Sequence, residues 1–180
     1  MGTTRRNLLL AALAAACGTR VQASIPADVA AELPGARLAG SGRLTFLSFH
    51  VYDARLWVTD GFSAAEPLAS PLALEVEYAR SLPGRRVAER SLEEMKRVPG
   101  MSDEQAQRWL AWMAETFPDV APGDRLTGVL RPGESVRFLF NGRRRGELRD
   151  AEFARRFFSI WLGPQTSEPA LRGQLLGLPR

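Results

Sequence analysis

The sequence feature that most constrains the fold is a β-prone run at residues 40–57, which opens with Gly-Ser-Gly and holds the one histidine of the chain. The run is rich in β-branched and aromatic residues, the types that fit a pleated sheet. Apolar residues stand at both parities, which predicts a central strand covered on both faces. Ser48, His50 and Tyr52 share one parity and are expected to form a ligand-facing polar cluster. The competing interpretation is a core strand whose polar groups are satisfied locally.

The chain then shows one strand pattern followed by two helix patterns. Residues 72–78 alternate between apolar and polar positions, which places Glu75 on a solvent-facing side. Apolar residues recur at helical spacing over residues 85–98 and again in a second segment. Ser102 and Gln105 form a capping box that opens this second helix.

Strand patterns return in the C-terminal part of the chain. They cover residues 125–130, 136–140 and 146–148, and the pair Asn141-Gly142 predicts a hairpin turn between the last two. Asp150 is placed to cap a following helix, and a short last helix is expected to start at Thr166 or Ser167. Hairpin links without regular βαβ units predict an α+β fold with an antiparallel sheet.

Residues 1–23 have the pattern of an export signal. The pair Arg5-Arg6 precedes an apolar segment, and an A-x-A-like site at residues 21–23 predicts cleavage before Ser24. Paired arginines are also typical of a twin-arginine signal, so the export route stays open. We therefore predict one folded domain at residues 24–180 and a periplasmic or secreted location. The alternative is a lipoprotein anchored at Cys17.

Composition narrows the classes of partner. Cleavage would remove three of the 24 basic residues and none of the 20 acidic ones, leaving a net charge of about +1, which argues against a nucleic-acid partner. With one His, and its one Cys inside the predicted signal, the chain is expected to hold no disulfide, metal or other cofactor. No later segment has the roughly 20 apolar residues of a transmembrane helix. The oligomeric state stays open.

Several segments, in this order, resemble the chalcone isomerase-like family in its bacterial exported branch. They are Val51-Tyr-Asp-Ala54, Ser91-Leu-Glu-Glu-Met-Lys96, Phe138-x-x-Asn141-Gly142 and Phe157-Phe-Ser-Ile-Trp-Leu-Gly163. The resemblance implies an open-faced β-sandwich, in which helices pack on one side of a large antiparallel sheet. It also implies a cleft for a flat or elongated apolar ligand.

The family includes plant enzymes that cyclise chalcones and non-catalytic members that bind fatty acids. The arginine that holds the substrate oxyanion in the enzymes falls on Leu44 here, with Arg43 beside it. A one-residue shift turns a strand side chain to the other face, so Arg43 would need a bulge at Gly42 to reach the cleft. The tyrosine and asparagine of the enzymes fall on Val87 and Glu94, so the catalytic set is not kept.

The resemblance implies four ligand contacts. Tyr52 matches a tyrosine of the fatty-acid binders, Ser48 would replace a family threonine, and Thr166 or Ser167 would supply a hydroxyl near the C-terminus. Arg43 would hold a carboxylate through a charge-assisted hydrogen bond.

These contacts favour an exported, non-catalytic protein that binds a small apolar molecule such as a fatty acid, with no catalytic residue predicted. One alternative is an isomerase or lyase that acts on an unsaturated carbonyl compound. The other is a structural or partner-docking periplasmic protein.

Overall fold

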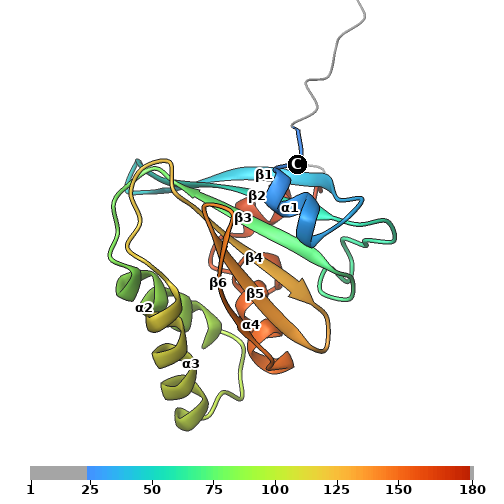
Figure 1. Cartoon of the computed structure of the whole chain (residues 1–180). Coiled ribbons are helices and arrows are strands. Elements are labelled where there is room, and N and C mark those ends of the chain that lie inside the picture. Colours follow the sequence, from blue (N-terminus) through green and yellow to red (C-terminus); the bar gives the residue numbers. More distant parts are fainter. Residues whose placement is uncertain (1–23, 179–180) are drawn as a thin grey trace, which may run out of the picture.

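Six antiparallel strands lie side by side in the order β1-β2-β3-β4-β5-β6, so each strand neighbours the next one in the sequence. The computed structural model describes residues 24–178 and places five helices around this sheet (Figure 1). The predicted export signal, with Cys17 in it, lies outside the described residues. The strands are β1 Arg37–Phe46, β2 Phe49–Val58, β3 Leu72–Tyr78, β4 Arg125–Arg131, β5 Ser135–Phe140 and β6 Arg143–Leu148. The helices are α1 Ala27–Glu32, α2 Gly84–Met95, α3 Asp103–Thr116, α4 Ala151–Leu162 and α5 Pro169–Leu175.

Helices α2 to α5 share one hydrophobic core with the inner face of the sheet, which confirms the predicted α+β architecture. The apolar stripes of these helices and the inward residues of β2 to β5 are removed from water together, the main stabilising contribution in such a fold. The capping box of Ser102 and Gln105 is present at the start of α3, as the sequence predicted. Asp150 likewise caps α4 by accepting a hydrogen bond from the Phe153 backbone N–H.

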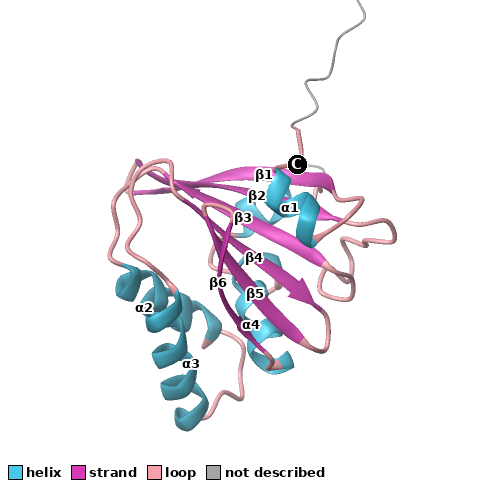
Figure 2. Cartoon of the chain, in the orientation of Figure 1, coloured by secondary structure: helices cyan, strands magenta, loops and turns pink. Residues whose placement is uncertain are grey.

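The short helix α1 lies on the opposite face of the sheet, a position that the sequence did not predict (Figure 2). Val29 and Leu33 pack there against the outward side chains of Trp57, Ala73 and Val129, forming a second apolar cluster. The outer face is therefore partly covered rather than open to solvent. Within residues 24–178, no helix has the length and apolar character needed to span a bilayer.

The prediction of one central strand at residues 40–57 was wrong. This run forms the hairpin of β1 and β2, which turns at Leu47-Ser48, and β1 is an edge strand. Apolar residues occupy both parities because Leu44 pairs with Tyr52 while Thr45 pairs with His50. This register shift bulges β2 between the two pairs and moves the alternation by one residue.

The Gly-Ser-Gly opening of the run is explained by close packing. Gly40 and Gly42 lie in β1 against α5, and a Cβ at Gly40 would come within 2.1 Å of the Gln174 carbonyl oxygen. Glycine is therefore required where the helix approaches the strand backbone.

Candidate functional site

A cavity of about 450 Å³ lies between the inner face of the sheet and helices α2 and α4. Strands β1 to β5, both of these helices and the segments that follow β3, α3 and α4 supply its lining. The lining residues are Leu44, Phe46, Val51, Tyr52, Leu74, Val76, Tyr78, Leu82, Arg86, Val87, Arg90, Ser91, Glu94, Phe117, Leu126, Gly128, Phe138, Phe157, Ile160, Trp161, Ser167 and Glu168.

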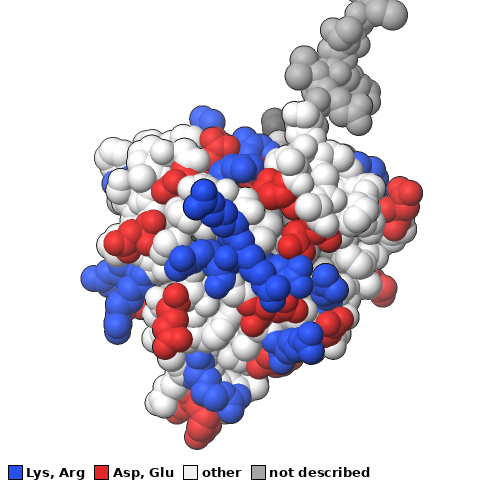
Figure 3. Space-filling view, viewed as in Figure 1, with Lys and Arg blue, Asp and Glu red and all other residues white. Residues whose placement is uncertain are grey.

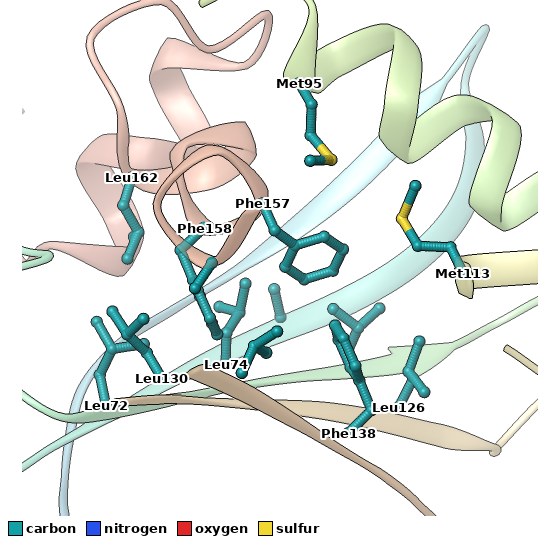
Figure 4. Packing of buried hydrophobic residues seen from close by; sticks show 14 of the residues in the cluster. Leu72, Leu74, Met95, Met113, Leu126, Leu130, Phe138, Phe157, Phe158 and Leu162 are labelled. Atoms are coloured by element: carbon teal, nitrogen blue, oxygen red, sulfur yellow. The ribbon is translucent and has the colours of Figure 1, made fainter. Parts of the chain in front are cut away.

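Most of the cavity wall is aliphatic or aromatic. Figure 4 shows Phe157 reaching from α4 toward the sheet, where Phe138 rises from β5 to meet it. Their ring centroids lie 4.9 Å apart with the planes at 82°, an edge-to-face arrangement. Gly128 leaves room for the aromatic rings, since a Cβ there would come within 3.2 Å of both Phe138 and Phe158. This wall suits an apolar ligand.

Polar groups gather around Tyr52. Trp161 donates a hydrogen bond from Nε1 to the Tyr52 hydroxyl oxygen at 2.8 Å, which fixes the phenol and leaves its own proton free to be donated. Tyr78 packs edge-on against Tyr52, with ring centroids 6.2 Å apart. Arg90, Glu94 and Glu168 lie close enough to influence the pKa of Tyr52 electrostatically. Tyr52 is therefore at the polar end of the cavity.

Arg90 and Glu94 form an ion pair one helical turn apart on α2. The Glu94 side chain is only 8% exposed, whereas that of Arg90 is 65% exposed. Within residues 24–178, Glu94 Oε2 is buried and has no hydrogen-bond partner, although Arg97 lies 3.7 Å from it. The polar end thus offers a phenol proton, a guanidinium and a carboxylate. No group of three metal-ligating side chains occurs in the described part of the chain.

Burial raises the pKa of Tyr52 to about 12 from an ordinary value of 10.0, and it raises the pKa of Tyr78 even further. The native state therefore keeps two protons that the unfolded chain releases above pH 10. The stabilisation is complete below pH 10 and is lost as pH rises toward 12 and beyond.

We expect the phenolate absorbance of the folded protein to stay close to its baseline at pH 10, where an ordinary tyrosine is half ionised, because the chain has just these two tyrosines. The measurement is a spectrophotometric pH titration followed in parallel by circular dichroism. A phenolate signal with a midpoint near pH 10 in protein that is still folded would contradict the buried positions.

The structure brings Tyr52 to the cavity but not Arg43, Ser48 or Thr166. Arg43 points to the outer face of β1, where its Nε donates to Asp53 Oδ1 at 2.7 Å. The pairs of Gly42 with Ala54 and of Arg43 with Asp53 are regular, so no bulge at Gly42 turns Arg43 inward. Leu44, the next residue, lines the cavity instead.

Ser48 and Thr166 also lie outside the cavity lining, whereas Ser167, the alternative to Thr166, is part of it. Ser48 sits in the exposed hairpin turn with φ 67°. The buried Thr166 hydroxyl donates to the Ile160 carbonyl oxygen at 2.7 Å and accepts from the Glu168 backbone N–H, so it shapes the loop before α5. His50 lies beside Asp53 on the outer face, with 3.2 Å between Nε2 and Oδ2.

The sequence did not identify the polar residues that accompany Tyr52 in the cavity. Trp161 lies in an apolar helical pattern and Arg90 in an amphipathic one, so neither residue carries a local signal of a binding site. The resemblance did provide a signal, since Leu44, Val87 and Glu94, the three positions matched to catalytic residues, all line the cavity.

Three comparisons place these features among known proteins. The model of a family described as chalcone isomerase-like matches residues 20–177. An uncharacterized protein of Haemophilus influenzae is 31% identical over 138 residues, which make up 77% of this chain and 66% of that protein. The chain thus spans just under two thirds of that relative's length. The crystal structure of an Arabidopsis thaliana fatty-acid binding protein matches with a TM-score of 0.60 at 15% identity, covering 79% of this chain and 87% of the other.

Proposed function

Because the chain belongs to the chalcone isomerase-like family, we propose that it binds a small, elongated apolar molecule of the fatty-acid class and performs no catalysis on it. The observation that carries this proposal is the apolar cavity of about 450 Å³ with Leu44 and Val87 in its wall. Neither side chain can donate a hydrogen bond to a substrate oxyanion, the stabilisation that chalcone cyclisation needs. The cavity volume is in the usual range of small-molecule sites, roughly 300–1,000 Å³.

The polar end of the cavity is suited to hold a head group. Tyr52 has a phenol proton to donate, because its oxygen already accepts from Trp161. Arg90, from α2, adds a partly exposed guanidinium to the lining. We infer that a ligand carboxylate binds between these two groups while its alkyl chain lies along Phe138 and Phe157. A fatty-acid binding protein of the same fold supports this ligand class.

Export is part of the proposal, because residues 1–23 carry the sequence pattern of an export signal. The test is native mass spectrometry of the protein isolated from the periplasm of its own cells. We expect the mass of a chain that begins at Ser24, together with one equivalent of a bound acyl compound. The compound is identified after its release from the protein. Ligand-free protein that also fails to take up palmitate in a titration would refute binding, and turnover of a chalcone above the spontaneous rate would refute the absence of catalysis.

A matched pair of variants tests the head-group position. Tyr52→Phe should weaken palmitate binding roughly tenfold, because it removes one hydrogen bond to a charged group and little volume. Arg43→Ala is the control, since this side chain lies on the outer face of the same hairpin. An Arg43→Ala loss equal to that of Tyr52→Phe would contradict the position that the geometry gives.

A further inference from the structure

The tip of the β1–β2 hairpin exposes an unusual amount of apolar surface. The exposed fractions of Phe46, Leu47 and Phe49 are 65%, 76% and 61%. Only two other large apolar residues within residues 24–178 are exposed, Ile25 and Leu178, at 39% and 40%. A cluster of exposed apolar side chains at a projecting turn is typical of an interaction site rather than of ordinary protein surface.

The backbone of the turn holds an apolar side chain at the outermost position. Leu47 and Ser48 have φ of 47° and 67°, the left-handed conformation that Asn and Gly usually adopt in a two-residue hairpin. The hairpin of β5 and β6 has Asn141-Gly142 at the same positions. At the β1–β2 turn the fold therefore carries a less favourable leucine, which adds to the apolar tip.

The tip is continuous with the cavity and is bordered by positive charge. Phe46 is exposed at the tip and also lines the cavity. The exposed Arg80 lies over the Phe49 ring, 5.3 Å from its centroid, and Arg86 lines the same cavity as Phe46. In Figure 3 the upper left, where Figure 1 places the hairpin tip, is mostly uncharged, and basic surface lies below it over α2.

Acidic groups do not cancel this charge. Within residues 24–178, Arg85 and Arg86 share one acidic partner, Glu89, and both arginine side chains are 77% exposed. Arg80 therefore adds positive charge at the apolar tip, and Arg85 and Arg86 leave an excess of positive charge on α2. Aromatic and aliphatic side chains flanked by arginines are the pattern of a protein segment that enters the head-group region of an anionic bilayer.

We propose that the β1–β2 tip inserts into an anionic phospholipid surface. Insertion of Phe46 would bring the adjoining wall of the cavity to the membrane, so that an apolar ligand passes between bilayer and cavity without crossing water. Docking rests on the apolar tip and the neighbouring arginines, whereas the transfer of ligand rests on the proposed function.

The test is flotation of the protein, isolated as its own cells process it, with phosphatidylcholine vesicles that contain or lack phosphatidylglycerol. The double variant Leu47→Asn with Phe49→Ser removes two apolar side chains, keeps Phe46 in the cavity wall and gives the turn a residue suited to positive φ. We expect a roughly hundred-fold fall in partitioning onto anionic vesicles. Ile25→Ser, which removes an exposed apolar residue outside the hairpin, should leave partitioning unchanged.

Arg80→Ala leaves the apolar tip intact and tests the charge. It should lower partitioning about fivefold on anionic vesicles and leave it unchanged on neutral ones. Parent protein that does not float, or a double variant that floats like the parent, would overturn the docking proposal. A self-association that the double variant abolishes, seen by analytical ultracentrifugation, would instead assign the tip to contact with a second copy.

The two proposals fail separately. If the protein takes up palmitate in solution but does not bind vesicles, the docking proposal is refuted and the proposed binding function stands. If the protein floats with vesicles but does not take up palmitate, the proposed binding function is refuted and the docking proposal stands.

Discussion

Replacing Glu75 with glutamine is expected to lower the free energy of unfolding by about 3 kcal/mol, the lower end of the usual loss when a buried ion pair is broken. The Glu75 side chain on β3 is only 1% exposed and pairs with Arg55 and, at 3.2 Å, with Arg125. Glutamine keeps the shape but leaves these two arginines without their shared anion. Both arginines are about 30% exposed, at 31% and 29%, so solvent limits the loss. Urea denaturation followed by circular dichroism measures it.

Glu77→Gln is the matched control for Glu75. It lies two residues further along the same face of β3 and also pairs with Arg55, but its side chain is 38% exposed. An exposed pair of this kind contributes about 0–1 kcal/mol. Equal losses in the two variants would show that burial of Glu75 does not govern the stability of this cluster.

Glu75 also shows where sequence reasoning reaches its limit. Strict alternation along β3 correctly separates Leu74 and Val76 from Glu75, but alternation alone predicts that Glu75 faces solvent, and this prediction is wrong. The side chain is buried because Arg55 and Arg125 close over it and α1 occupies part of that face. Helix α1 has six residues, too few to give a clear periodic pattern before the sheet is known.

The two hairpin turns differ in how well local sequence predicts their backbone conformation. Asn141-Gly142 was predicted because these residues favour positive φ, which the structure confirms at 48° and 80°. Leu47-Ser48 adopts a similar turn with residues that have no such preference, so local sequence gave no sign of it. The long helices, the capping box and the C-terminal strands were predictable because their signals are local.

The candidate site depends on contacts that no local pattern records. Tyr52 and Trp161 are 109 residues apart in sequence yet share a hydrogen bond. The resemblance to the family indicated that Leu44, rather than Arg43, occupies the position that faces the ligand. Only the strand register showed that Arg43 stays outside, paired with Asp53.

Val87 is a position from which the cavity can be closed with little disturbance of the core. It lies on α2, lines the cavity and is only partly buried, so a larger side chain there can extend into the cavity without displacing packed neighbours. A larger side chain at a completely buried wall position would lower the stability of the protein more, because overpacking a filled core forces backbone shifts.

Val87→Trp is therefore expected to weaken palmitate binding roughly a hundred-fold with little change in melting temperature. An indole that excludes about four methylene groups of the ligand removes about 3 kcal/mol of apolar burial, which corresponds to that loss of affinity. Titration with a fluorescent fatty acid measures it. Arg85→Trp is the control, because it places the same side chain on α2 at a 77% exposed position outside the cavity lining. Binding that survives Val87→Trp would mean that the ligand occupies another surface, and the proposed function would then lose the cavity on which it depends.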